Sequence, residues 1–184
     1  MLSKDAAPTW HADVAAIGLE RGRSLSASID MDAAPSALWQ GITTPGQLKR
    51  CHPFCESTTV DTWPGAGSRD SITYYSGRTY RRNFVDWIDG VGYDIELGDR
   101  PNPTARVLWR IAPISDTACR LSIEVVPYLK ADLSETKKAQ YQDRLFGADL
   151  QHYLESVVQG GAYWITTGRN VDKDQFGSNP LYSG

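Results

Sequence analysis

Hydrophobic and polar residues alternate from the first clear element of the chain onward. In residues 24–30 (SLSASID), Leu25, Ala27 and Ile29 alternate with polar residues, mostly serine. Strict alternation of this kind predicts a β-strand with one buried face. The first element of the domain is therefore expected to be a strand that packs on a core.

A short helix is predicted directly after this strand. Pro35 suits the first helical turn, because proline has no amide hydrogen to leave unpaired there, and Asp32 is the expected N-cap. Leu38 and Trp39 then begin a short apolar stripe. A second proline interrupts the stripe and starts another short helix over residues 45–50.

Six further strand-like segments follow without a helical pattern between them. Turns of two to six residues join them, which favours antiparallel neighbours. A parallel sheet would need helical crossovers, and none is predicted. The six segments are residues 56–62, 68–75, 78–88, 91–97, 104–112 and 117–128.

The chain then changes to helical spacing. Ser134 is the expected N-cap of a long helix that ends near Thr167, with a possible break near Gly147. Apolar residues recur every three or four positions and form a wide apolar face. Gly160 and Gly161 lie inside this helix, where they allow a close approach to a strand or leave room for a ligand. The predicted class is α+β: a seven-stranded antiparallel sheet wrapped around a long C-terminal helix, with two short helices between the first two strands.

At 184 residues the chain is most economically one domain. Residues 24–168 are predicted to form that domain, after a partly helical N-terminal extension (1–23) and before an irregular C-terminal tail (169–184). The apolar side of the extension must rest on the domain or on a second subunit, so a homodimer is possible.

Charge and composition exclude several partners. The formal net charge is −3, which gives no electrostatic footprint for a nucleic acid. No segment approaches the ~20 apolar residues of a membrane helix, and the first residues lack the pattern of a signal peptide. We expect a cytoplasmic protein whose three cysteines are free thiols.

Strand alternation identifies candidate binding residues on the inner face of the sheet. It groups Arg82 with Phe84 and Asp86, and an inward arginine needs a buried partner. Asp70, Asp86 or an acidic group of a ligand could supply it; an internal ion pair and an outward arginine remain alternatives. The full candidate set from strands and final helix is Tyr74, Tyr80, Arg82, Tyr93, Trp109, Leu154 and Val158.

Catalytic residues are not assigned by any motif. Zinc needs three or four ligands at suitable spacing, and the neighbourhood of His52 and Cys55 does not supply them, so no metal is expected. Cys55 as a nucleophile with His52 or His152 as base is one hypothesis. A loop held in place by Pro53 and Phe54, without a catalytic role, is the other. No cofactor motif is present, because the glycines of residues 65–67 join strands and do not open a helix.

Several segments resemble the START-like superfamily, also called SRPBCC, and its polyketide cyclase/dehydrase-related branch. They are residues 29–39 (IDMDAAPSALW), 43–48 (TTPGQL), 52–55 (HPFC), 63–65 (WPG) and 175–177 (QFG). The resemblance covers about residues 24–168 and implies a helix-grip fold with an apolar cavity between sheet and final helix. Members bind lipids, sterols, polyketides or plant metabolites, and some are cyclases or aromatases, without a shared catalytic set.

Three functional hypotheses remain open at this point. The first is binding of a small hydrophobic or aromatic molecule in the internal cavity. The second is a cyclase or aromatase that uses the same cavity. The third is a non-catalytic module that dimerises through its extension and exposed tryptophans.

Overall fold

The computed structural model describes residues 10–184, and the side chains of all of these except residues 10–12 and 145. One antiparallel sheet has the strand order β1-β8-β7-β6-β5-β4-β3, and β2 also pairs with β8. The strands are β1 (Leu19–Arg21), β2 (Leu25–Met31), β3 (Cys55–Thr62), β4 (Arg69–Tyr74), β5 (Thr79–Ile88), β6 (Gly92–Leu97), β7 (Ala105–Ser115) and β8 (Ala118–Lys130).

All seven predicted strands are present and antiparallel, within three residues of the expected ends. The eighth strand, β1, lies in the segment predicted as an extension. Leu19 pairs with Lys130 and Leu25 pairs with Val125, so β1 and β2 lie end to end along β8. Residues 1–9 of the predicted extension lie outside the described residues.

Five helices complete the described chain: α1 (Trp10–Ala16), α2 (Pro35–Ile42), α3 (Leu48–Cys51), α4 (Glu135–Leu145) and α5 (Ala148–Thr167). Pro35 is the first residue of α2, as predicted, but Asp32 as its N-cap is wrong. Ala34 occupies that position and no side chain caps the helix, because the chain needs two more residues to leave β2. The predicted cap at Ser134 is confirmed, since its hydroxyl accepts a hydrogen bond from Lys137 N. The predicted break lies between α4 and α5.

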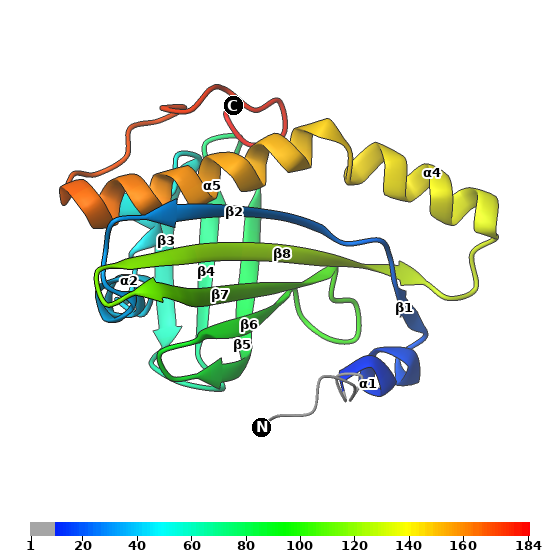
Figure 1. Ribbon diagram of the computed structural model, residues 1–184. Coiled ribbons are helices and arrows are strands. Elements are labelled where there is room, and N and C mark those ends of the chain that lie inside the picture. Colours follow the sequence, from blue (N-terminus) through cyan, green and yellow to red (C-terminus); the bar gives the residue numbers. More distant parts are fainter. Residues whose placement is uncertain (1–9) are drawn as a thin grey trace.

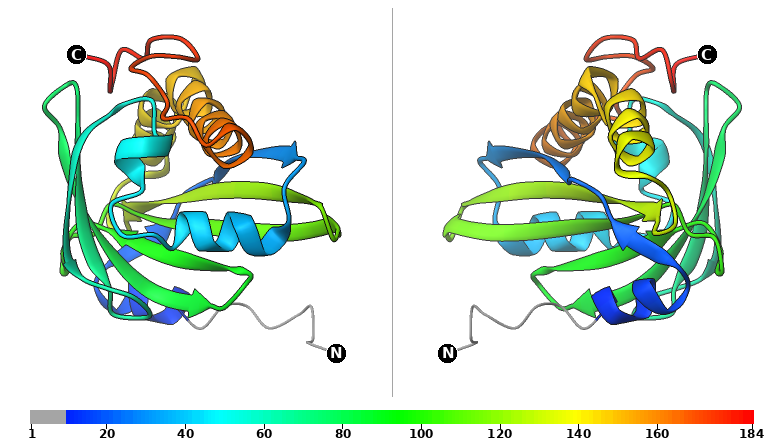
Figure 2. Two further views of the ribbon diagram at one scale, coloured as in Figure 1. Left: turned by 90° about the vertical axis from the view of Figure 1, so that its left-hand side faces the viewer. Right: turned by 90° about the vertical axis from the view of Figure 1, so that its right-hand side faces the viewer.

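The sheet curves around α5, which lies along its concave side (Figures 1 and 2). The main core fills the space between them and includes Tyr93, Trp109, Leu154 and Val158. A second apolar cluster, here called the tail cluster, lies between α3, β3 and β4. It comprises Leu48, Cys51, Phe54, Cys55, Ile72 and Tyr74, with Tyr80, Tyr153, Trp164 and Tyr182 packed against it.

The C-terminal tail has turns but no helix or strand, and it runs back over α5 (Figure 1). Backbone hydrogen bonds fix it to the domain: Val171 N donates to Arg50 O, and Ser76 N donates to Tyr182 O. At the other end of the chain, Val14 of α1 is buried within the chain itself. No helix in the described part of the chain is long and apolar enough to span a membrane.

Candidate functional site

The predicted binding residues fall into two separate places in the structure. Tyr93 and Trp109 lie in the main core, where their ring centroids are 5.7 Å apart. Leu154 and Val158 lie in the same core. Tyr74 and Tyr80 lie in the tail cluster, with ring centroids 5.9 Å apart. The structure therefore brings these residues into two groups and not around one point.

Arg82 makes an internal ion pair. Its Nε donates to Asp70 Oδ1 at 2.6 Å, and its Nη2 donates to Asp70 Oδ2. Both side chains are buried, and the two parallel hydrogen bonds satisfy the charges that burial would otherwise leave unpaired. The sequence suggested three partners for an inward Arg82: Asp70, Asp86 or an acidic group of a ligand. In the structure the partner is Asp70.

The inward placement of Asp86 is wrong. The pairing of β5 with β6 shifts between Phe84 and Asp86, and the extra residue of such a bulge reverses which side chains face inward. Asp86 is consequently exposed. Trp87 turns inward in its place and stacks on Tyr93 with ring centroids 5.5 Å apart.

A buried chain of hydrogen bonds crosses the tail cluster. His52 Nδ1 accepts from Phe54 N at 3.2 Å, which places the remaining imidazole proton on Nε2 when the ring is neutral. Nε2 is 3.0 Å from the Tyr153 hydroxyl, and that hydroxyl is 2.8 Å from the Tyr74 hydroxyl. Burial, and secondarily the positive charge of Arg82, lowers the pKa of His52 to about 3. The imidazole is therefore neutral at neutral pH.

The surroundings of Cys55 disfavour the thiolate form that a nucleophile would need. Burial raises the pKa of its thiol to about 11, whereas a reactive cysteine needs a lowered pKa. Its Sγ donates to Ser57 O at 3.4 Å. Cys51, Cys55 and Cys119 are all free, as predicted. Among the described side chains, no three metal-ligating groups gather closely enough to hold an ion.

The tail covers this chain of hydrogen bonds. The Tyr182 ring lies 4.4 Å from that of Tyr153 and 4.6 Å from that of Tyr74, between centroids. His152, considered above as a possible base, has its Nε2 3.2 Å from Phe176 O of the tail. These contacts join residues that are distant in sequence, and no local pattern predicts them.

An open groove lies at the other end of β4 and β5. It has a volume of about 610 Å³ and is lined by Trp39, Thr43, Pro45, Trp63, Pro64, Gly65, Trp87 and Asp89. Here it is called the tryptophan groove. None of these residues was among the predicted binding residues.

Three different elements supply the indoles of the tryptophan groove. Trp39 comes from α2, Trp63 from the turn after β3, and Trp87 from β5. The Trp87 ring lies 5.5 Å from that of Trp39 and 5.4 Å from that of Trp63, edge to face in both cases. Trp63 Nε1 donates to Thr43 O at 2.9 Å, and Trp87 Nε1 donates to Asp89 Oδ1 at 3.1 Å. These bonds fix two of the three rings.

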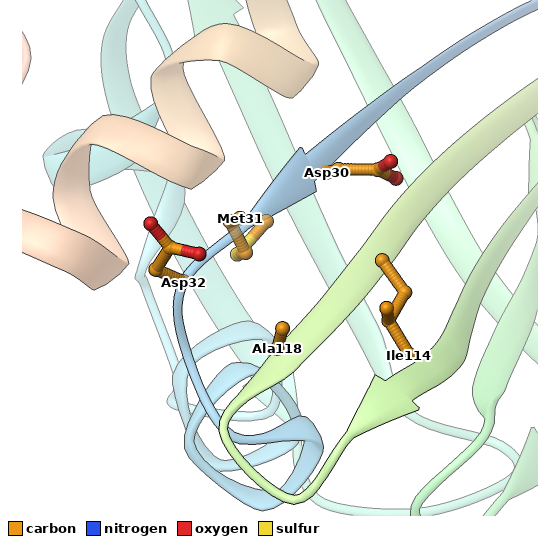
Figure 3. A pocket seen from close by; sticks show the side chains of 5 residues that line it. All are labelled: Asp30, Met31, Asp32, Ile114 and Ala118. Carbon is orange, nitrogen blue, oxygen red and sulfur yellow. The ribbon is translucent and has the colours of Figure 1, made fainter.

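A second, smaller depression of about 270 Å³ lies at the end of β2 beside the β7–β8 turn (Figure 3). It is lined by Asp30, Met31, Asp32, Ile114 and Ala118. The carboxylates of Asp30 and Asp32 do not converge on one point (Figure 3), and Asp30 is already paired with Arg120. The tryptophan groove is the stronger candidate, because it is larger and aromatic.

Comparison with known proteins identifies the fold. No family model and no curated protein matches this chain. Solved structures do match, among them norcoclaurine synthase from Thalictrum flavum, with a TM-score of 0.62 and 9% identity over 81% of this chain and 98% of that one. The di-domain ARO/CYC BexL from the BE-7585A biosynthetic pathway has a TM-score of 0.61 and 11% identity over 79% of this chain and 48% of that one. The protein XoxI from Bacillus cereus has a TM-score of 0.56 and 11% identity, covering 79% and 97%.

These neighbours, with the order of elements, define the class of this protein by its architecture. The chain has the helix-grip fold that these solved structures share, which is the fold that the sequence resemblance implied. One of these neighbours is an ARO/CYC protein of the BE-7585A biosynthetic pathway. At identities near 10% the similarity establishes the fold alone.

Proposed function

We propose that this protein binds a small apolar or aromatic molecule in the tryptophan groove. The observation that carries the proposal is an open hollow of about 610 Å³ with three indoles on its wall. Small-molecule sites typically measure about 300–1,000 Å³ and combine aromatic walls with few polar groups. The groove matches both properties, because its ionisable lining consists of Asp89 alone.

Aromatic side chains behind the tryptophan groove connect it to the main core. Trp87 stacks on Tyr93, and Tyr93 packs on Trp109, so one column of rings runs from the groove into the main core. We include Tyr93 in the proposed site as the residue directly behind Trp87. Tyr74, Tyr80 and Arg82 belong to the far end of the same strands and do not line the groove.

The fold neighbours support binding of a small organic molecule by this architecture. A norcoclaurine synthase variant was solved in complex with a transition state analogue. A cyclase or aromatase activity is the second candidate for this chain, favoured by the architecture that it shares with the ARO/CYC protein BexL. In that case the same groove holds the substrate.

A neutral fluorescent probe tests the proposal without knowledge of the natural ligand. N-phenyl-1-naphthylamine is expected to bind saturably, with one molecule per chain and emission shifted to the blue. Trp39→Leu should weaken its affinity about tenfold, which corresponds to about 1.4 kcal/mol of lost aromatic contact.

Trp164→Leu is the matched control, since it makes the same chemical change in α5 outside the groove lining. Its probe affinity should equal that of the wild type. Absence of saturable binding, or equal affinities in Trp39→Leu and the wild type, contradicts the proposal.

A further inference from the structure

We propose that the ligand of the tryptophan groove carries a positive charge, of the ammonium type, on an apolar or aromatic body. The inference rests on the proposed function and adds the charge of the ligand to it. It follows from three properties of the groove: its ionisable group, its hydrogen-bond donors and its ring faces.

The ionisable group of the groove is a carboxylate. Asp89 is the single charged residue in a lining that contains no lysine, arginine or histidine. Among the described residues no cationic side chain pairs with Asp89, and its Oδ1 accepts from Trp87 Nε1 at the groove wall. An anionic ligand would meet a like charge here, whereas a cation would meet its counter-charge.

The hydrogen-bond donors of the groove are largely engaged inside the protein. Trp63 Nε1 and Trp87 Nε1 donate to Thr43 O and Asp89, and the Thr43 hydroxyl donates to Trp39 O at 2.6 Å. Of the four lining side chains that can donate, Trp39 is the remaining one. Among the side chains of the lining, one donor (Trp39 Nε1) and the Asp89 carboxylate therefore remain for a ligand, and the carboxylate suits a ligand that brings its own donors or positive charge.

The aromatic walls favour the same ligand. The face of an aromatic ring is negative, and indole attracts cations more strongly than the other aromatic side chains. The three rings meet at interplanar angles of 69° and 83°, so they present differently oriented surfaces to one hollow. A quaternary ammonium group has no N–H to hydrogen-bond with water, so it can contact several such surfaces at once without losing such bonds.

A pair of isosteric probes separates charge from shape. Benzyltrimethylammonium and neopentylbenzene have nearly the same form, and the first carries a positive nitrogen where the second has carbon. We expect benzyltrimethylammonium to bind at least fivefold more tightly than neopentylbenzene. Titration of the tryptophan fluorescence at low ionic strength measures both affinities. Asp89→Asn should weaken binding of the cation about three- to tenfold, because the exposed carboxylate acts in a screened environment, and should leave neopentylbenzene unchanged.

Asp132→Asn is the control for charge, because this exposed aspartate lies in the loop between β8 and α4, outside the groove lining. It should bind the cation as the wild type does. Asp89 is exposed at a turn, and asparagine keeps an acceptor for Trp87 Nε1, so the variant is expected to fold.

The outcomes distinguish this inference from the proposed function. Equal or tighter binding of neopentylbenzene by the wild type overturns the positive charge and leaves the apolar site intact. Binding of neither probe, together with failure of the neutral fluorescent probe, overturns both. Unchanged cation affinity in Asp89→Asn removes Asp89 from the site.

Discussion

His52 is a residue whose charge is determined by its surroundings. Phe54 N donates to its Nδ1, so a second proton on the ring would displace that hydrogen bond. The side chain is also buried beside Arg82. Both effects oppose the imidazolium form, and burial is the larger of the two.

The low pKa of His52 predicts a loss of stability in acid. The unfolded state takes up a proton near pH 6.5, whereas the folded state does so at about pH 3. Between these values the unfolded state holds more protons, so the free energy of unfolding falls as the pH falls, by about 1.4 kcal/mol per pH unit. Urea unfolding between pH 7 and 5 should show a steeper pH dependence for the wild type than for His52→Gln. Equal slopes would show that His52 titrates normally.

None of the residues that line the tryptophan groove was predicted from the sequence as a binding residue, and of the predicted set only Tyr93 lies directly behind the groove. The partnership of Arg82 with Asp70 was among the stated alternatives, because alternation places both on the inner face. Trp87 was missed, since a bulge is invisible to a strict period of two. Trp39 and Trp63 lie far from Trp87 in sequence, and their meeting depends on how α2 and the turn after β3 approach β5.

At the scale of elements, the two glycines of α5 have different neighbours. A Cβ at Gly160 would overlap the carbonyl oxygen of Cys51, at the end of α3. A Cβ at Gly161 would lie 3.1 Å from Leu121 Cδ2, in β8. Close approach to a strand was one of the two reasons predicted for these glycines, and Gly161 approaches a strand, whereas Gly160 approaches a helix. A side chain at Gly160 would meet backbone atoms, whereas a side chain at Gly161 would meet only a methyl group of Leu121.

Gly160→Ala should therefore lower the free energy of unfolding by about 1–3 kcal/mol, although alanine is the better helix former. The reason is that α5 and α3 must move apart to admit the methyl group. Gly161→Ala is the matched control and should change stability less, because the Leu121 side chain can shift. Urea denaturation of both variants measures the difference. A Gly160→Ala protein as stable as the wild type would contradict this interpretation of the contact.

The larger elements were predictable because the apolar residues of each recur with the period of a strand or of a helix. Alternation identified seven strands, and the stripe of α5 identified the helix that they surround. Strand β1 was missed, because three residues are too few to show alternation. Its position depends on β8, which has 13 residues and extends beyond β2.

At the scale of the whole molecule, the two ends of the sheet differ: the C-terminal tail covers one end, and the tryptophan groove opens at the other. Tail residues cover the end marked by the β4–β5 turn, where Ser76 N donates to Tyr182 O. The tryptophan groove opens at the other end, beside the turns that follow β3 and β5. The tail thus packs against the sheet at one end and takes no part in the lining of the groove.

Tyr182→Ala should destabilise the protein by about 1–3 kcal/mol, because it removes a ring that packs on Tyr74 and Tyr153. Tyr141→Ala is the control, since Tyr141 is 54% exposed on α4 and should change little. Affinity for N-phenyl-1-naphthylamine should be the same in both variants, because the groove lies at the opposite end. Equal stabilities of the two variants would show that the tail does not support the domain.

The position of β8 has a consequence for the order in which the chain folds. Leu25 and its partner Val125 are about 100 residues apart, so β2 leaves the ribosome roughly 5–20 seconds before the strand that completes its hydrogen bonds. Pairing of such distant segments is also slow in refolding, because a long loop must close first. Strand β2 is therefore expected to join the sheet last, and Ser26, Ser28 and Asp30 keep one of its faces polar until it pairs.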